Sequence, residues 1–376
     1  MNNIQVILIC QYPLPNKNIA SWTTMYNYYL KNKSHPIDYI ICPKDVDKIP
    51  DVDYSYVKGK SLVVNLRNLR YKKRFNSYFK ALDKVIQKEN KYIIQIIDNS
   101  GIIEPLNLHL KKKYKRKDFY IQYFYHGFDI LYSGKNATAF LNGIDEMIFL
   151  TKLSYQRYKD YYSELIFRAG IMHNAVSSKL FYKLEASAKQ RLKASMGISS
   201  QLVFMWCSQD RPKKGLQLIL DVWKKIYNGN SLEMQLLIIG VDKEILQEGV
   251  IVIGRVPNDE LPKYYQVSDF YLFPSLCKEG FGIVLAEALK CGCYCIASNQ
   301  GGIPEVLAHG EYGKIIENPN FIDEWVEEIT NSIKEYINNG YENPYYSDEF
   351  DKLYDLDNWC QQMNRKIEEA KLNFSN

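Results

Sequence analysis

Two glutamates, Glu279 and Glu287, are the residues of this chain whose types and spacing most clearly suggest chemistry. Residues 281–289 are apolar almost throughout, so the helix that they predict should be buried, where an ionised carboxylate is costly without a partner. Glu279 precedes this helix, at the end where free N–H groups and the helix dipole favour an anion. Eight helical residues rise about 12 Å, which suits a sugar at one carboxylate, a nucleoside at the other and a diphosphate between them. The pair therefore predicts a nucleotide-sugar site.

A structural interpretation of the same pair is also available. Glu279 could cap the start of its own helix, and Glu287 could pair with a neighbouring lysine or arginine. The sequence that follows favours phosphate binding instead, because residues 294–297 predict a short buried strand and residues 299–306 form a second glycine turn, NQGGIPEV. A strand, a glycine turn and a helix in succession are the usual cradle for a phosphate group.

A basic turn occupies the corresponding place after an earlier strand. Residues 202–207 predict this strand, and Arg211, Lys213 and Lys214 follow it, directly ahead of Gly215.

Together, the segments EGFGIVLAE and GGIPEVL and the basic turn resemble the signature of the retaining GT-B glycosyltransferases of family 4, the glycosyl transferases group 1. The resemblance implies a GT-B fold of the α/β class, with two Rossmann-like domains facing across a deep interdomain cleft. It implies that Glu279 binds the transferred sugar and that Arg211 and Lys214 bind the diphosphate, with Lys213 as an adjacent alternative to Lys214. The donor-binding positions that it implies are Phe281, Gly282, Ile283, Val284 and Glu287, the last on the ribose.

His126 completes the predicted catalytic set of Arg211, Lys214, Glu279 and His126. It lies in the segment YFYHG, where residues 119–125 predict a strand, and ligands bind at strand ends in open α/β sheets. The family often places a histidine here against the transferred sugar. The alternative is a structural histidine that is bonded to the backbone.

Strands and helices alternate along the chain, which predicts parallel sheets covered by helices. We expect an acceptor-side domain over residues 1–170, a donor-binding domain over 171–349 and a C-terminal helix over 350–372 that packs back on the first domain. The length of 376 residues suits two domains. Strands are expected over residues 4–10, 61–66, 92–98, 119–125, 146–150, 202–207, 234–239, 250–253, 270–273 and 294–297.

The loop after the first strand departs from the family. Members commonly place a glycine pair there, against the donor phosphate, whereas Ile19 and Ala20 occupy the place in this chain. This departure motivates an alternative function, a non-catalytic sugar-nucleotide-binding subunit that supports a partner transferase. A GT-B epimerase is the other alternative. An NAD oxidoreductase is disfavoured because the turn at Gly280 and Gly282 lacks the third glycine of the dinucleotide fingerprint.

Charge is unevenly distributed. Residues 1–170 hold 27 Lys and Arg against 15 Asp and Glu, a formal charge of +12, whereas the remainder carries −7. Much of the excess is in residues 67–75 and 111–117, which are mixed with aromatic or apolar residues and would suit an anionic membrane surface. A solvated charged face is the alternative. No nucleic-acid-binding module accompanies either cluster, so we expect no nucleic-acid partner.

We expect no metal or other cofactor. The eight cysteines follow no disulfide framework, and the triplets at residues 45–47 and 51–53 lie in a polar stretch where chance surface acids are the simpler explanation.

The chain begins with a strand pattern, which predicts a cytoplasmic protein, associated at most peripherally with the inner face of the membrane. The expected reaction moves a hexosyl-type sugar from a UDP- or GDP-sugar to a glycan or lipid-linked acceptor, in bacterial surface polysaccharide or lipid-linked glycan synthesis.

Overall fold

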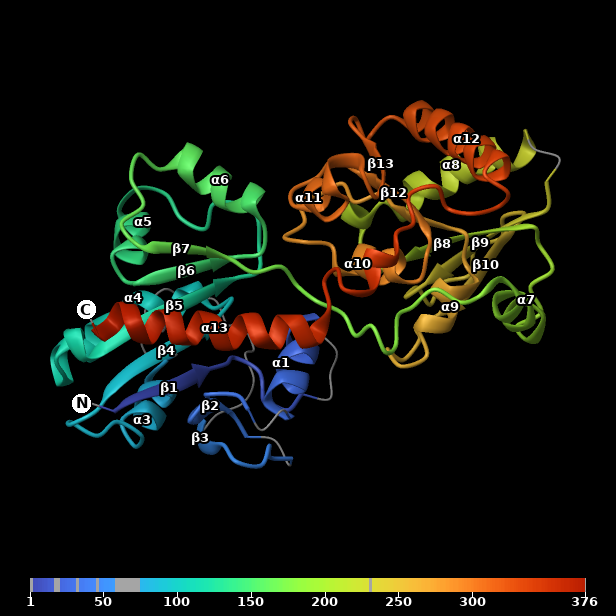
Figure 1. The fold of residues 1–376 in the computed structure, drawn as a ribbon. Helices are drawn as coiled ribbons and strands as arrows, with labels where there is room; N and C mark the ends of the chain where they lie inside the picture. Colours follow the sequence, from blue (N-terminus) through green and yellow to red (C-terminus); the bar gives the residue numbers. More distant parts are fainter. Residues whose placement is uncertain are drawn as a thin grey trace. The chain divides into compact units, whose positions relative to one another are not determined.

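The computed structural model describes residues 3–16, 21–31, 34–44, 47–57, 75–229 and 232–375. The chain forms two compact units, of which unit 1 comprises residues 1–174 and 359–376 and unit 2 comprises residues 175–358. Each unit is a parallel sheet with helices on its faces (Figure 1). The predicted fold class of two Rossmann-like domains is confirmed at the level of each unit.

Unit 1 is built on a seven-stranded parallel sheet in the order β3-β2-β1-β4-β5-β6-β7. The first strand therefore lies inside the sheet, and the strand order reverses between β1 and β4. Its strands are β1 (Ile4–Ile9), β2 (Tyr39–Pro43), β3 (Asp53–Val57), β4 (Lys91–Ile97), β5 (Phe119–Tyr125), β6 (Glu146–Phe149) and β7 (Arg168–Ile171). Its helices are α1 (Ser21–Lys31), α3 (Asn76–Leu82), α4 (Ile103–Lys113), α5 (Gly134–Leu141), α6 (Lys152–Tyr161) and, from Trp359 onward, α13 (Leu356–Ser375).

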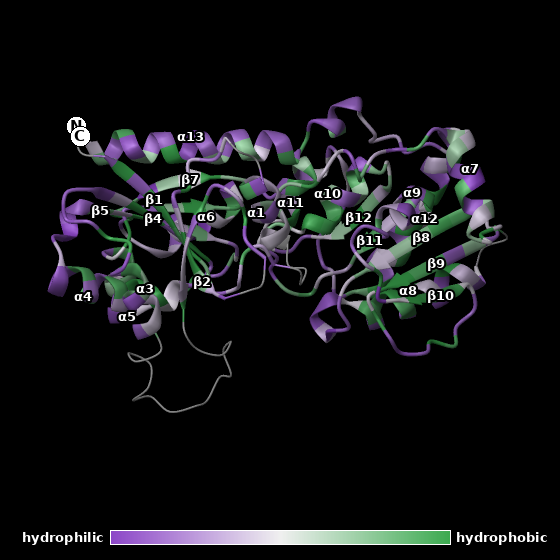
Figure 2. Cartoon of the chain, turned by 90° about the horizontal axis from the view of Figure 1, so that it is seen from below, coloured by the Kyte–Doolittle hydropathy of each residue, from purple (hydrophilic) through white to green (hydrophobic). Residues whose placement is uncertain are grey.

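Helix α13 lies along the strands of unit 1 (Figure 1). The Tyr29 hydroxyl donates to the Asn364 side chain at 2.6 Å, and the Trp359 ring packs edge-on against Tyr26. The sequence predicted this helix over residues 350–372, but it begins at Leu356, because residues 348–351 form a short 3-10 turn that belongs to unit 2. Figure 2 shows hydrophilic and hydrophobic residues alternating along α13, as expected for a helix with one face on a sheet.

Unit 2 is built on a six-stranded parallel sheet in the order β10-β9-β8-β11-β12-β13. Its strands are β8 (Leu202–Cys207), β9 (Met234–Ile239), β10 (Val250–Gly254), β11 (Phe270–Phe273), β12 (Tyr294–Ser298) and β13 (Gly313–Ile316). Its helices are α7 (Ala186–Ser195), α8 (Leu216–Asn228), α9 (Pro262–Val267), α10 (Ile283–Lys290), α11 (Ile303–Val306) and α12 (Ile322–Asn338).

The core of unit 2 follows from the alternation of side chains along each strand. Phe204 and Trp206 of β8 face the main core with α8 and α12, whereas Val203 faces a smaller cluster with Val267 on the opposite side. Because both faces are covered, the strands are apolar almost throughout, and Figure 2 shows them as mostly hydrophobic.

Several strands differ from expectation. β2, β3, β7 and β13 were not predicted, and the strand expected over residues 61–66 lies outside the described residues.

Candidate functional site

The predicted donor residues of unit 2 gather at one place in its sheet. The strand order reverses between β8 and β11, so the loops that follow these two strands diverge to opposite sides and leave space at their carboxyl ends. The loop after β8 carries Arg211 and Lys214, and the loop after β11 carries Glu279 and leads into α10. The strand order of the sheet therefore brings together residues that lie far apart in the sequence.

A direct ion pair joins the two loops. The Lys214 ammonium lies 2.5 Å from a Glu279 carboxylate oxygen, and the same oxygen accepts a hydrogen bond of 2.6 Å from the Ser275 hydroxyl. Both charged side chains are partly exposed, so the pair remains open to solvent and to a ligand. Lys213 instead projects an exposed side chain, and it is its backbone carbonyl that accepts the Leu276 amide at 2.8 Å. The geometry favours Lys214 over Lys213 as the partner of Glu279.

Glycine permits the close approach of these loops. Gly215 has φ +73°, and a Cβ atom there would lie 2.0 Å from the Pro274 carbonyl oxygen. A side chain at this position would therefore require both an unfavourable backbone conformation and displacement of the loop that carries Glu279.

The second glycine turn supports Glu279 from the other side. Gly301 has φ +67°, and a Cβ atom there would lie 2.4 Å from the Glu279 carbonyl oxygen, which in turn accepts the Gly302 amide at 2.8 Å. The turn that was predicted to cradle phosphate thus fixes the backbone that positions the carboxylate.

Helix α10 begins directly beyond this loop. Phe281 is buried and Gly282 adopts a left-handed conformation with φ +85°, which turns the chain into the helix. Ile283 and Val284 are half-buried in the first turn. The first N–H groups of a helix lack intrahelical acceptors, so this end offers donors to an anion.

Glu287 lies one helical turn further along, half-buried, and accepts a hydrogen bond of 2.8 Å from the Tyr265 hydroxyl. Removal of water raises the pKa of Glu287 to about 7, and the Tyr265 hydrogen bond only partly offsets this effect. No lysine or arginine pairs with Glu287 in the part of the chain that the structure describes. The structural interpretation of an ion pair is therefore unsupported, and the carboxylate keeps unused acceptor capacity.

Arg211 is exposed at the start of the short 3-10 turn Pro212–Lys214, and its backbone amide donates to the Gln209 carbonyl at 2.8 Å. Its guanidinium forms no ion pair within the described residues. Arg211 is thus an uncompensated cation on the same loop as Lys214.

His126 belongs to unit 1, where it follows β5. Its backbone amide donates to a carboxylate oxygen of Asp98 at 3.4 Å, at the end of the neighbouring strand β4. Burial lowers the pKa of His126 to about 4, so the imidazole is neutral at pH 7. The structure therefore places this predicted residue at the carboxyl edge of the unit 1 sheet, beside the β1/β4 reversal.

Tyr265, Ser275 and Asp98 were not predicted as site residues. Ser275 has a weak sequence signal, because it follows a strand and lies four residues before Glu279. The contact of Tyr265 with Glu287 depends on the packing of α9 against α10 and has no local signature. Ile19 and Ala20, which motivated the alternative of a non-catalytic subunit, lie outside the described residues.

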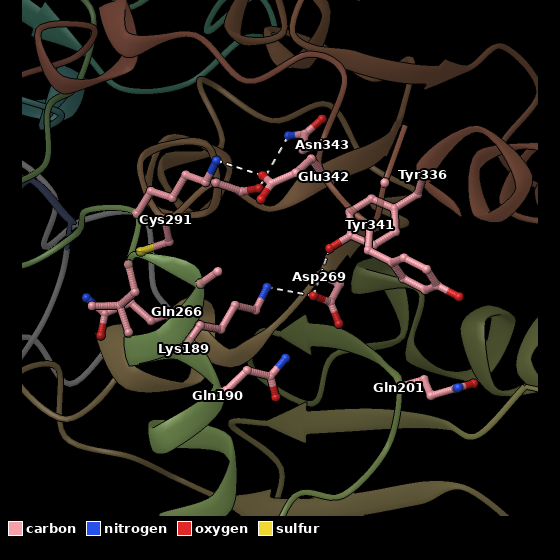
Figure 3. A pocket seen from close by; sticks show the side chains of 15 residues that line it. Lys189, Gln190, Gln201, Gln266, Asp269, Cys291, Tyr336, Tyr341, Glu342 and Asn343 are labelled. Carbon is pink, nitrogen blue, oxygen red and sulfur yellow. Dashed lines mark hydrogen bonds and ion pairs between the residues drawn. The ribbon is translucent and has the colours of Figure 1, made fainter. Parts of the chain in front are cut away.

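A cavity of about 340 Å³ lies at the opposite edge of the unit 2 sheet (Figure 3). Asp269, at the start of β11, is buried beside it and accepts from Lys189, Lys193, the Val203 amide and the Tyr336 hydroxyl, at 2.6 to 3.1 Å. Burial alone would raise the pKa of Asp269, but the two ammonium groups hold it below its ordinary value. The charged groups at this edge are therefore already paired with one another.

Two further features concern cofactors and membranes. Among the described residues, no group of three or more His, Cys, Asp or Glu side chains is arranged to hold a metal ion, although Asp45 of the first Asp-x-Asp triplet is not among them. In the described ranges, the helices also lack the combination of length and apolar character that a bilayer span requires.

Comparisons with known proteins identify what the chain resembles. Residues 189–344 match the family model described as "Glycosyl transferases group 1". The chain is 27% identical over 253 residues to the N-acetyl-alpha-D-glucosaminyl L-malate synthase of Bacillus anthracis, which covers 62% of this chain and 63% of that protein. It is 25% identical over 149 residues to the lipopolysaccharide 1,2-N-acetylglucosaminetransferase of Salmonella typhimurium, which covers 35% of this chain and 39% of that protein. The chain thus spans less than two thirds of the length of these relatives.

Solved structures extend the likeness to the whole fold. Sucrose-phosphate synthase from Thermosynechococcus elongatus has a TM-score of 0.74 at 15% identity, over 99% of this chain and 100% of that one. HepE from Anabaena, solved with UDP-glucose, has a TM-score of 0.69 at 15% identity, over 97% and 99%. The predicted resemblance to the glycosyl transferases group 1 and the predicted GT-B fold are confirmed.

Proposed function

We propose that this protein is a retaining glycosyltransferase that moves a hexosyl-type sugar from a nucleoside-diphosphate sugar to an acceptor hydroxyl. The observation that carries the proposal is the contact between Lys214 and Glu279, which unites two loops at the reversal of strand order in unit 2. The family match over residues 189–344 and the UDP-glucose complex of the structurally similar HepE support this assignment. The donor is a UDP- or GDP-sugar.

The proposed roles follow from the charge that develops during transfer. Cleavage of the anomeric bond makes the sugar oxocarbenium-like and the departing diphosphate more negative, so fixed cations stabilise the transition state more than the ground state. Arg211 and Lys214 supply these cations, and the N–H groups of Ile283 and Val284 add hydrogen-bond donors. In the free protein Glu279 neutralises Lys214, and we propose that donor binding shifts Glu279 to the sugar hydroxyls.

Glu287 is proposed to bind the ribose hydroxyls. Only the Tyr265 hydroxyl donates to it among the described residues, so a carboxylate with several acceptor positions retains room for two ribose O–H groups. His126 is proposed to contact the transferred sugar as a neutral imidazole. Retention at the anomeric centre is implied by the family resemblance, with the leaving phosphate accepting the proton of the attacking hydroxyl.

Calorimetry with a panel of UDP- and GDP-sugars, followed by mass spectrometry of acceptor products, tests the proposal. We expect micromolar to millimolar binding of one nucleotide class, transfer of one sugar residue, and equal activity in buffer that contains EDTA, because cations of the protein take the role of a metal at the diphosphate. Failure of every sugar nucleotide to bind would overturn the donor assignment. Binding without any product would favour the alternative of a non-catalytic subunit.

The acceptor is proposed to be a glycan or a lipid-linked glycan presented at an anionic membrane surface. In α4 of unit 1, Lys111 and Lys112 are exposed next to the half-exposed apolar side chain of Leu108, whereas Arg116 is engaged by Asp145 at 2.8 Å. The first basic cluster lies almost entirely outside the described residues. In sedimentation with vesicles that contain anionic lipid, the wild-type protein should pellet with the vesicles, whereas a Lys111→Glu, Lys112→Glu variant should remain in the supernatant. Equal pelleting of both proteins would contradict the proposal.

A further inference from the structure

Lys290, the last residue of α10, is a buried lysine at the opposite end of the helix from the proposed phosphate site. Only 1% of its surface is exposed, and its ammonium donates to the Ser178 hydroxyl at 2.9 Å and to the carbonyls of Phe350 and Asp351 at 2.8 and 3.0 Å. These acceptors use all three N–H donors of the ammonium. Burial lowers the pKa of Lys290 to about 8, so the group is still largely charged at pH 7.

The acceptors of Lys290 come from the two segments at which unit 2 begins and ends, residues 175–178 and 350–358. These segments also bind each other. The Val176 amide donates to the Tyr354 carbonyl at 2.9 Å, and the Ser178 hydroxyl lies 2.5 Å from an Asp355 carboxylate oxygen. Lys290 thus joins three pieces of chain that are remote in sequence.

Tyr354 connects the same terminal segment to the other end of α10. Its ring lies edge-on to Phe281, with ring centres 5.1 Å apart, and its hydroxyl donates to the Val306 carbonyl of α11 at 3.2 Å. Phe281 lies two residues before the start of α10, and α11 follows the second glycine turn. The segment 350–358 therefore contacts both ends of the helix that carries Glu287.

A buried charged side chain contributes little net free energy to folding stability. Taking an ammonium out of water costs several kcal/mol, and apolar residues of similar volume often fill such sites as well or better. A charged group with three directed donors fixes one arrangement of its partners, whereas an apolar side chain would allow several. The contacts of Lys290 are therefore suited to position α10 in one place.

We propose that Lys290 is a positioning residue of the donor site, which locks α10 to the two terminal segments of unit 2 so that donor binding at one end of the helix stiffens the segments at the other. This inference rests on the proposed function, because it requires a nucleoside diphosphate at the start of α10. It assigns to residues 175–178 and 350–358 a response to donor binding, although they do not contribute to the proposed donor contacts.

The test combines calorimetry with hydrogen–deuterium exchange of the full chain, using UDP as the probe (GDP if the panel selects guanine). In the wild-type protein, a saturating concentration should slow exchange in peptides that cover residues 175–180 and 350–358. In Lys290→Met, we expect this protection to be lost even at saturation, and the Kd to rise by about tenfold. Lys225→Met is the matched control, because Lys225 also lies in the last turn of a helix, α8, but is exposed and forms a surface ion pair with Asp323. It should behave as wild type.

The outcomes separate the inference from the function on which it rests. Nucleotide binding to Lys290→Met with unchanged affinity and unchanged protection would overturn the inference alone. Failure of the wild-type protein to bind any nucleoside diphosphate would overturn both. If Lys290→Met does not fold, Ser178→Ala removes one acceptor and leaves the lysine in place; it should lose part of the protection, and full protection in this variant would overturn the inference.

Discussion

The two edges of the unit 2 sheet each carry a charged cluster, and the two clusters differ in how fully their charges are paired. At the amino edge, Asp269 is buried and receives four hydrogen bonds, two of them from lysines, beside a cavity whose walls are already neutralised. At the carboxyl edge, Lys214 and Glu279 form a partly exposed pair, and Arg211 is exposed. Both clusters contain carboxylates and cations, but only the second leaves charge for a ligand.

This difference shows why burial of charge does not by itself identify a binding site. Asp269 has a strongly perturbed environment, yet its lysines and its hydroxyl and amide donors satisfy it completely, so a ligand would have to displace existing bonds. Glu287 has a perturbed environment and, among the described residues, a single hydroxyl partner. We therefore propose a structural role for the amino edge and a binding role for the carboxyl edge, and mutations can separate the two.

The largest expected effect on stability is at the amino edge. Asp269→Ala leaves the buried Lys193 and the partly exposed Lys189 without their carboxylate partner, so the free energy of unfolding should fall by about 3 to 5 kcal/mol. Denaturant unfolding measures this loss, and calorimetry on the protein that remains folded should show unchanged nucleotide affinity.

The matched control is Asp323→Ala, which removes an exposed carboxylate that also pairs with a lysine. Its effect on unfolding should stay below about 1 kcal/mol. An Asp269→Ala protein of normal stability that no longer binds nucleotide would reverse the assignment of the two edges.

At the carboxyl edge, Arg211→Ala should slow sugar transfer by about 100- to 1,000-fold, the usual cost of losing one preorganised electrostatic group, or about 3 to 4 kcal/mol. Unfolding should change by no more than about 0.5 kcal/mol, because Arg211 is exposed. Steady-state kinetics and thermal unfolding measure the two quantities.

Lys213→Ala provides the comparison within the same loop. Because Lys213 contributes its backbone to the loop and projects an exposed side chain, we expect less than a tenfold change in transfer rate. Equal losses in the two variants would mean that the net charge of the loop, rather than the position of Arg211, governs the rate.

A smaller and pH-dependent effect is expected at Glu287. Its pKa rises from 4.5 to about 7 on folding, so the folded protein holds this proton more tightly than the unfolded chain, and stability falls as pH rises from about 4.5 to 7. Glu287→Gln removes this loss. The difference in free energy of unfolding between Glu287→Gln and wild type should therefore shift by about 3 kcal/mol in favour of the variant between pH 4 and pH 8.

The same variant should bind the nucleotide more weakly at pH 8, because an ionised carboxylate accepts stronger hydrogen bonds from ribose than an amide does. Unfolding curves at the two pH values and calorimetry at pH 8 measure both effects. A variant that gains no stability with rising pH would show that Glu287 is well solvated and would remove the reason for expecting a ligand there.

Much of the fold was predictable, and three of the four strands that were missed share a physical reason. β3, β7 and β13 are edge strands with partly exposed residues, so they lack the continuous apolar run by which β4, β5, β8 and β9 were recognised. β2 is short and follows a polar stretch. The central strands carry the strongest signal because helices cover them on both faces.

For the site, the sequence predicted which charged residues would come together but not the residues that hold them in place. Lys214 and Glu279 were identified from motifs, and the structure brings them into contact. Tyr265 and Ser275 were missed because their roles arise from packing between segments rather than from local spacing. Lys290 was missed for the same reason, since its acceptors lie more than 50 residues away along the chain.

A crystal structure of the protein with bound UDP, or GDP if the panel selects guanine, tests the central claim most directly. The account predicts a diphosphate within hydrogen-bond distance of the Lys214 ammonium and of the amides of Ile283 and Val284, with the ribose hydroxyls on Glu287. A nucleotide in the cavity beside Asp269, with the carboxyl edge empty, would contradict it.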